Sequence, residues 1–258
     1  IESVYHWNKK KRRKLQRFMT SSSAQPTVLH ADQEHAGLRT AVFVLLFVVT
    51  IAAFLGIQAV FRAVGAVDYA FVASCGGALP VALAVVWVIE KLLKQYWPSG
   101  RSVTLTHDGL QLQTEEAAQW EITRAHEPTA LFWHFDLRGW QRGGRERRVP
   151  RTWLCLAVEL KSGKKEAVVY TFLPKNKART WLAREDGLHF HEIFPREVYD
   201  NSLRSRMGGP ARPEIPAAVL TGKDGKYWLA ERRRWTEGFE LPPQEFEQFM
   251  NHIQTILN

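Results

Sequence analysis

Two long apolar runs lie close together in the first third of the chain, from Ala41 to Phe61 and from Tyr69 to Ile89. About 20 apolar residues in a helix cross the hydrocarbon core of a bilayer, so each run is long enough to span it. The linker, residues 62–68, is too short to form a domain. We therefore predict a helical hairpin with both outer ends on one side of a membrane. The region between residues 39 and 91 has only three charged residues: Arg62, Asp68 and Glu90.

The residues that flank the apolar runs are mostly basic. Eight Lys and Arg residues lie within residues 1–40, Lys91, Lys94 and Arg101 follow the second run, and Arg62 is the only basic residue of the linker. Basic flanks stay on the cytoplasmic side, so we expect an integral protein of the cytoplasmic (inner) membrane with both termini cytoplasmic. The basic N-terminal extension, residues 1–40, should bind anionic phospholipid at the membrane surface. The residues predicted to do so are Lys9, Lys10, Lys11, Arg12, Arg13 and Lys14.

Small residues cluster in the second apolar run, where they would allow close packing against the first helix or against a partner. Its cysteine, Cys75, and the distant Cys155 are the only two in the chain. This excludes a secreted module held by disulfides, and we expect both to be small buried apolar residues. The first residue is Ile1, so we expect further residues before it, and we find no cleavable signal peptide. The small residues are Ala73, Ser74, Gly76, Gly77 and Ala78.

Beyond Trp97, apolar and polar residues alternate, which is typical of strands half buried in an antiparallel sheet. The turns His107-Asp108-Gly109 and Lys161-Ser162-Gly163-Lys164 separate paired strands. Many short strands with close turns indicate an antiparallel sandwich or barrel. The predicted strands are residues 102–106, 110–114, a third around Trp120 and Ile122, 131–137, 153–160, 166–172, and a last pair at 217–220 and 226–230.

Two helices are predicted within this second part. A short one should run from Pro174 to Arg184, and a longer one from Pro242 to Leu257. The longer helix has one apolar stripe, formed by residues spaced three and four apart, and prolines at its start. Its polar face has Glu245 and Glu247 but no Lys or Arg, which disfavours an anionic membrane surface. We expect this helix to pack across the open end of the sheet.

A family resemblance follows from these elements. The hairpin, the strand pair SVTLTHDGLQLQT directly after it, the strand QWEI and the terminal helix LPPQEFEQF resemble bacterial YcxB-like membrane proteins, which have a pleckstrin-homology-like (PH-like) domain. The likeness covers residues 41–122 and 217–257 best. It implies a seven-strand PH-like barrel capped by the C-terminal helix, and the family supplies no defined chemistry. The chain departs from the family in its basic extension, an Arg-rich loop (138–151) and an insertion (185–216).

The fold class predicted is therefore an α+β membrane protein with three parts. Residues 1–40 form the cytoplasmic extension, residues 41–97 the transmembrane hairpin, and residues 98–258 a cytoplasmic PH-like β domain.

Basic and aromatic residues gather in two segments of the β domain. The Arg-rich loop has six arginines in fourteen residues, and a second group lies at residues 232–235. Arginine binds phosphate and carboxylate with two parallel hydrogen bonds, and Trp fits a protein pocket or the headgroup boundary. We expect these residues to bind a partner or lipid; the alternative is plain solvated charge. They are Arg138, Trp140, Arg142, Arg145, Arg147, Arg148, Arg151, Arg232, Arg233, Arg234 and Trp235.

Other kinds of chemistry find little support. His189 and His191 could share one face of a strand, but zinc or iron needs three or four ligands, so we predict neither metal nor cofactor. Motifs for nucleotide binding and for serine hydrolases are absent, and no carboxylate pair is placed for acid–base work, so we predict no enzyme and no small-molecule substrate. The net charge of +9 would suit nucleic acid, but the basic run precedes a membrane entry, which explains it more simply.

The sequence thus favours a non-catalytic accessory or scaffold subunit of a larger membrane complex. Its partners would be other subunits and anionic phospholipid, not nucleic acid. Ten Trp residues support this choice, because aromatic and Arg residues are enriched at protein interfaces. A regulatory membrane protein that senses lipid headgroups is the alternative.

Cysteine labelling tests the predicted topology. A cysteine placed at Ala66 should react with an impermeant thiol reagent from outside the cell, because the linker is predicted to lie there. A cysteine at Gly163 should react only after permeabilisation. The reverse pattern would contradict the orientation derived from the flanking charges.

Overall fold

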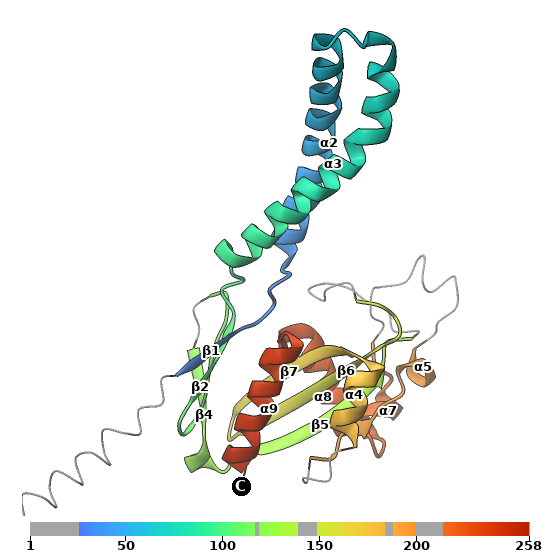
Figure 1. Cartoon of the computed structure of the whole chain (residues 1–258). Coiled ribbons are helices and arrows are strands. Elements are labelled where there is room, and N and C mark those ends of the chain that lie inside the picture. The colour runs from blue at the N-terminus through green and yellow to red at the C-terminus, as the bar shows by residue number, and fades with distance from the viewer. Residues whose placement is uncertain (1–25, 117–118, 139–148, 184–187, 200–213, 258) are drawn as a thin grey trace, which may run out of the picture.

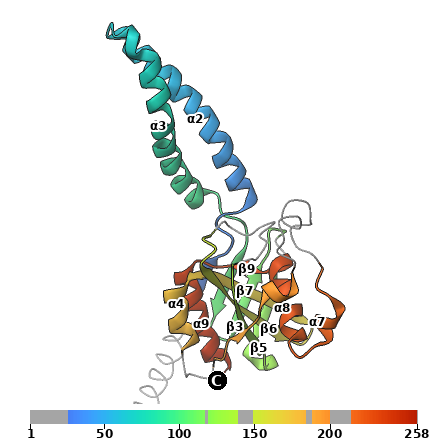
Figure 2. The same cartoon turned by 90° about the vertical axis from the view of Figure 1, so that its right-hand side faces the viewer.

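The computed structural model describes residues 26–116, 119–138, 149–183, 188–199 and 214–257. A pair of long helices projects from a β-rich domain, and both ends of the pair meet the domain at one place (Figures 1 and 2). The structure is therefore an α+β protein with a helical hairpin and a sheet domain, as predicted at that level.

The hairpin consists of α2 (Ala36–Ala63) and α3 (Val67–Tyr96), which are antiparallel neighbours. Both are long and apolar enough to cross a membrane. Gly65, with a φ of 76°, lies in the tight turn between them, in a conformation that favours glycine. The predicted spans lie inside these helices, which extend beyond them at both ends.

Residues spaced four apart on α3 form the face that is buried against α2. Ser74 and Ala78 belong to this face, and a side chain added at Gly77 would approach Ile57 Cδ1 to 3.2 Å. The small residues of α3 therefore serve the contact within the hairpin. Cys155 is buried as expected, but Cys75 is exposed, because it lies outside that face. The buried residues of α3 are Ala70, Ser74, Ala78, Ala82 and Val86.

One sheet has four antiparallel strands in the order β1-β2-β3-β4. They are β1 (Thr27–His30), β2 (Ser102–Thr106), β3 (Gly109–Gln113) and β4 (Gln119–Thr123). The three later strands confirm the prediction, whereas β1 was not predicted. Since β1 pairs with β2, the whole hairpin is inserted between two neighbouring strands of one sheet.

The second sheet has the order β8-β5-β6-β7-β9. Its centre is an antiparallel meander of β5 (Thr129–Asp136), β6 (Trp153–Ser162) and β7 (Lys165–Pro174), as predicted. Two-residue strands, β8 (His191–Glu192) and β9 (Phe239–Glu240), pair in parallel with its edges. A short 3-10 helix, η1 (Arg124–His126), connects β4 to β5.

The main core lies between the two sheets and α9 (Pro243–Leu257). Phe246, Phe249, Met250 and Ile253 of α9 are buried there with apolar residues of both sheets. The helix α4 (Lys175–Leu182) adds Ala178 to the same core, close to its predicted range. The terminal helix was predicted to pack across the open end of the sheet, and it does pack into the core that both sheets share.

The last predicted strand pair, residues 217–220 and 226–230, is wrong. These residues form the helices α7 (Ala217–Thr221) and α8 (Gly225–Glu237). The turn before α8 is so tight that a Cβ at Gly225 would lie 1.9 Å from the Leu220 carbonyl oxygen. Trp228 and Ala230 fit a strand by spacing, but they pack with Trp133 and Phe135 in a second core on the outer face of the sheet, beside α5 (Pro195–Val198).

The two sheets meet at Asp32, directly after β1. Ala31 N donates to the Arg101 carbonyl at 3.0 Å, and Asp32 N donates to the Glu240 carbonyl at 2.8 Å. The backbone is therefore bonded to the start of β2 at Ala31 and to β9 of the other sheet at the next residue, Asp32. Asp32 has a φ of 51°, in the left-handed region that Asp tolerates better than most residues.

Candidate functional site

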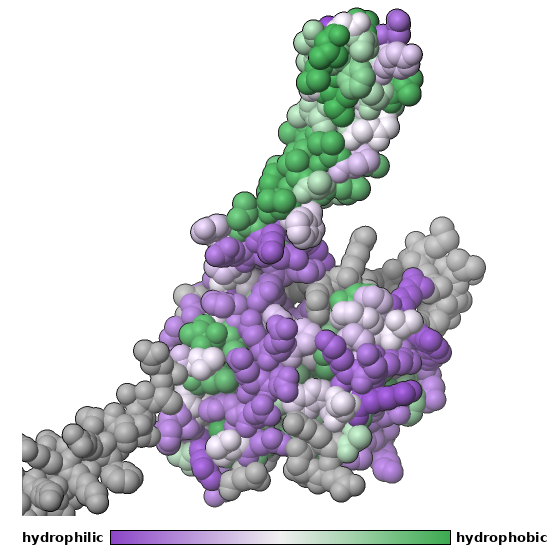
Figure 3. Space-filling view, viewed as in Figure 1, coloured by the Kyte–Doolittle hydropathy of each residue, from purple (hydrophilic) through white to green (hydrophobic). Residues whose placement is uncertain are grey.

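The place where the hairpin joins the β domain, called the neck here, comprises residues 31–38 and 90–101. At the neck, β1 leads into α2 and α3 leads into β2. The hairpin surface is apolar and becomes polar at the neck, as Figure 3 shows. The neck thus lies at the level where a bilayer surface would be if the hairpin spans it.

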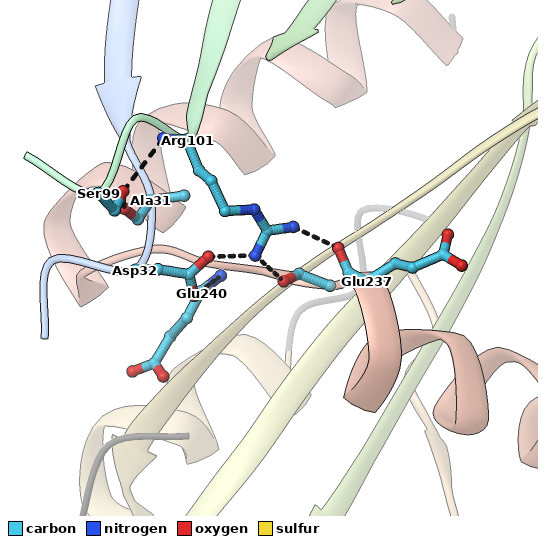
Figure 4. Close-up of polar contacts among 7 residues, drawn as sticks. Ala31, Asp32, Ser99, Arg101, Glu237 and Glu240 are labelled. Carbon is cyan, nitrogen blue, oxygen red and sulfur yellow. Dashed lines mark hydrogen bonds and ion pairs between the residues drawn. The ribbon is translucent and has the colours of Figure 1, made fainter. Parts of the chain in front are cut away.

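A buried arginine fastens the neck to the rest of the domain (Figure 4). Arg101 Nη1 donates to the Asp32 carboxylate and, at 2.9 Å, to the Gly238 carbonyl. Its Nη2 donates to the Glu237 carbonyl at 2.5 Å, and the guanidinium lies 4.1 Å from the centre of the Phe239 ring. Arg101 is only 3% exposed. This Arg101 clamp joins the segment after β1, the start of β2 and the junction between α8 and β9.

Ser99 and His35 close the neck on the side of the hairpin. Ser99 Oγ donates to the Ala31 carbonyl at 2.5 Å and accepts from Arg101 N at 3.1 Å. His35 Nδ1 accepts from Leu38 N at 3.3 Å, which caps α2. A neutral imidazole with its proton on Nε2 also donates to the Trp97 carbonyl at 3.2 Å. One side chain therefore binds the start of α2 and the end of α3.

Charged and aromatic side chains surround the neck. Lys94 Nζ lies 3.0 Å from Glu34 and 2.8 Å from Glu90. Each pair is half exposed and contributes little to stability alone, but together they link the bases of both helices. Tyr96 and Trp97 are exposed at the end of α3. Exposed aromatic rings at the end of a membrane helix are typical of the headgroup boundary.

The second basic group predicted from the sequence lies on α8, where its members have different surroundings. Arg234 is 1% exposed and pairs with Glu231, whose carboxylate also accepts from Trp133 Nε1 at 3.0 Å. Its guanidinium lies 4.5 Å from the centre of the Tyr170 ring, so Arg234 belongs to the interior and not to a docking surface. Arg232 is exposed, whereas Arg233 and Trp235 are half buried.

The Arg-rich loop is described only at its two ends. Arg138 and Arg151 are exposed. The Arg138 carbonyl accepts from Arg196 Nε at 2.7 Å, and Arg138 N donates to Asp136 Oδ1 at 2.9 Å. Burial works against ionisation of Asp136, but Lys175 at 2.6 Å lowers the pKa of its carboxyl group overall. The residues predicted for binding that lie outside the described ones are Trp140, Arg142, Arg145, Arg147, Arg148 and the run from Lys9 to Lys14.

The histidines of the HFHE stretch lie near a third histidine. His191 stacks on Tyr227 with ring centres 3.9 Å apart, and its Nε2 is 3.0 Å from Asp224. Burial, and then the nearby His191 and His189, lower the pKa of His134 to about 4. Within the described parts of the chain, no three His, Cys, Asp or Glu side chains are grouped to hold a metal ion.

Replacing Arg101 tests the clamp. Arg101→Ala leaves the Asp32 carboxylate buried without its cation, so we expect the free energy of unfolding to fall by about 3 to 5 kcal/mol. Urea denaturation of the detergent-solubilised chain, followed by Trp fluorescence, measures this loss. Arg124→Ala removes an equal charge from an exposed site and should cost less than about 0.5 kcal/mol. Equal midpoints for the two variants would contradict the clamp.

His134 should make stability depend on pH. The unfolded chain binds a proton near pH 6.5 and the folded chain only near pH 4, so the unfolded state gains protons first as pH falls. Neutral His134 contributes fully to the free energy of unfolding above pH 6.5. As pH falls towards 4, the free energy of unfolding should decrease by about 2 to 3 kcal/mol. Urea midpoints of His134→Gln should vary less over this window than those of the wild-type chain. The exposed His126→Gln should follow the wild type.

Comparisons with known proteins found no match for this chain. No family model matches the sequence, and neither a curated protein nor a solved structure matches it. The YcxB-like resemblance therefore stays an expectation from the sequence. The functional argument depends on the neck, the hairpin surface and the β domain.

Proposed function

We propose that the chain is a non-catalytic accessory or scaffold subunit of a larger complex in the cytoplasmic membrane. In this proposal the hairpin spans the membrane with both ends in the cytoplasm, where the β domain lies. The hairpin docks in the membrane part of the complex, and the β domain covers its cytoplasmic face.

The Arg101 clamp is the observation that carries the proposal. A flexible linker would be sufficient to keep a domain near a membrane. Here the hairpin instead continues directly from the paired strands β1 and β2, and a buried guanidinium fixes their ends to the junction between α8 and β9. Such a connection sets the position of the domain relative to the hairpin, and a scaffold needs this fixed relation.

The outer surface of the hairpin supports docking within the membrane. Large apolar side chains spaced four residues apart form a continuous exposed face on α2, and each is more than half exposed. Lipid or the helices of other subunits can cover such a face. Its members are Phe43, Phe47, Ile51 and Leu55.

We also propose that the β domain is PH-like. The strands β2 to β7, together with β1, form two sheets around one core, and α9 packs into that core. This arrangement agrees with the barrel and terminal helix that the resemblance implies. The chain also has β8, β9, α7 and α8, which do not belong to the seven-strand barrel and terminal helix implied by the resemblance.

Lipid-headgroup sensing is the second candidate function. The ends of β5 and β6 that flank the Arg-rich loop lie towards the hairpin side of the domain in Figure 1, so the loop begins and ends near the membrane surface of this proposal. Exposed arginines there would attract anionic headgroups, at about 1 kcal/mol each.

Purification in mild detergent tests the first proposal. We expect further membrane subunits to co-migrate with the tagged chain on a native gel. Single Ala changes across the Arg-rich loop should then have unequal effects: one or two positions should dominate, because a buried interface arginine can cost more than about 2 kcal/mol when truncated. Arg124→Ala, outside the loop, is the matched control. The series covers Arg138, Trp140, Arg142, Arg145, Arg147, Arg148 and Arg151.

Two results would contradict the accessory-subunit proposal. One is a chain that migrates alone under every mild detergent condition. The other is a flat series in which binding to anionic liposomes falls with total charge and is screened by salt, which would favour lipid sensing.

A further inference from the structure

A groove of about 270 Å³ opens beside α8, on the outer face of the five-stranded sheet. Its walls come from the start of β5, the end of β6 and one side of α8. These strand ends lie at the end of the domain farthest from the hairpin in both cartoon views (Figures 1 and 2). The strand part of the groove therefore lies away from the hairpin, whereas Arg233 lies one helical turn before Glu237 of the Arg101 clamp. Its lining residues are Thr129, Ala130, Leu131, Glu159, Lys161, Lys226, Leu229 and Arg233.

Cations form the rim of this groove, and of the two carboxylates that hold them Glu159 is hidden and Glu166 is partly exposed. Glu159 is 1% exposed, binds Arg233 Nη1 and lies 3.3 Å from Lys161 Nζ. Glu166, at the edge, lies 2.7 Å from Arg233 Nε and 3.2 Å from Lys161 Nζ. The buried carboxylate orders the guanidinium and the ammonium group but presents almost no negative surface. A ligand in the groove therefore meets cations that are already held in position.

Lys226 and Leu229 complete the groove from α8. Lys226 is exposed, its Nζ lies 5.0 Å from the centre of the Tyr227 ring, and it pairs with no carboxylate of the described residues. Leu229 is 39% exposed and, with Leu131 and Ala130, makes the groove partly apolar. The groove thus combines an available positive charge with an aliphatic surface.

The size of the groove limits what can occupy it. Pockets for drug-sized ligands and cofactors enclose about 300 to 1,000 Å³, and most of their surface is closed. This groove is smaller and open, so it suits one or two side chains of a polypeptide that lies across it. Its charge favours carboxylates in that polypeptide, and its apolar part favours an aliphatic side chain.

We propose that this groove docks an acidic, leucine-containing segment of a partner subunit on the outer face of the five-stranded sheet. The inference depends on the proposed function, since it names the chemistry of one partner contact of the accessory subunit. The partner carboxylates contact Lys226 and the rim formed by Arg233 and Lys161. The partner leucine covers Leu229 and Leu131.

A labelled peptide tests the groove directly. The full chain in neutral detergent is titrated into the fluorescein-labelled peptide EELDEL, and fluorescence anisotropy reports binding. The amide peptide QQLNQL has the same length and leucines without the charges. We expect EELDEL to bind at least about tenfold more tightly than QQLNQL, because several charge pairs act together.

Matched variants locate the binding. Lys226→Ala should weaken EELDEL binding by about three- to fivefold, as expected for one partly exposed charge pair. Leu229→Ser should weaken it by about tenfold through lost apolar contact. The controls are Lys223→Ala, an exposed lysine on the turn before α8, and Val28→Ser, an exposed apolar residue on β1. Both controls should bind as the wild-type chain does.

Three results would overturn the proposal. The first is equal affinity for the two peptides, and the second is an equal loss of EELDEL affinity in Lys226→Ala and Lys223→Ala. The third is displacement of EELDEL by phosphatidylserine vesicles but not by phosphatidylcholine vesicles. The last result would assign the groove to lipid. Native gels of the same variants separate this inference from the proposed function. A complex that persists unchanged in the Lys226→Ala/Leu229→Ser double variant overturns the groove alone. A wild-type chain without any complex overturns the accessory-subunit proposal.

Discussion

The rest of the structure depends on one buried guanidinium. Removing a charged side chain from water is costly unless it is paired and hydrogen-bonded. Arg101 donates to a carboxylate and to two backbone carbonyls, and its guanidinium lies over an aromatic ring. Because Arg101 and its acceptors come from three segments that are distant in sequence, this contact also brings both sheets and both ends of the hairpin together. The hairpin and the β domain are thereby joined by a buried contact, and this contact is the basis of the proposed scaffold role.

Much of the fold could be predicted because its elements have long, regular patterns. The hairpin follows from uninterrupted apolar runs, the strands from β2 to β7 from alternation, and α9 from a helical stripe. The strands β1, β8 and β9 have four, two and two residues, too short for any pattern, and they form only because a neighbouring strand pairs with them. The helix α8 was mistaken for a strand because Trp228 and Ala230, two residues apart, fit the strand period. Its buried face also includes the polar residues Glu231 and Arg234, so no apolar stripe marks the helix in the sequence.

The candidate sites were harder to predict, for a related reason. A run such as Arg232-Arg233-Arg234 looks uniform in sequence, yet its members are exposed, half buried and buried in turn. Arg233 meets Glu159, 74 residues earlier, and Arg101 meets Asp32, 69 residues earlier. No local pattern marks such pairs, so an isolated arginine in the centre of the neck carries no signal of its role. The excess of basic residues indicated anionic partners, but only packing separates arginines that are free to bind from arginines that hold the domain together.

If the hairpin spans a membrane as proposed, its position between β1 and β2 also couples the folding of the domain to the insertion of the two helices. Leu29 pairs with Val103 across the entire hairpin, so β1 can complete its sheet only when the two helices bring their ends back together. If the helices ended on opposite faces of the bilayer, the hydrocarbon core of about 30 Å would separate the two strands. The Arg101 clamp could not then form. If the hairpin spans a membrane, a complete β domain thus requires that both helix ends lie on one side of it.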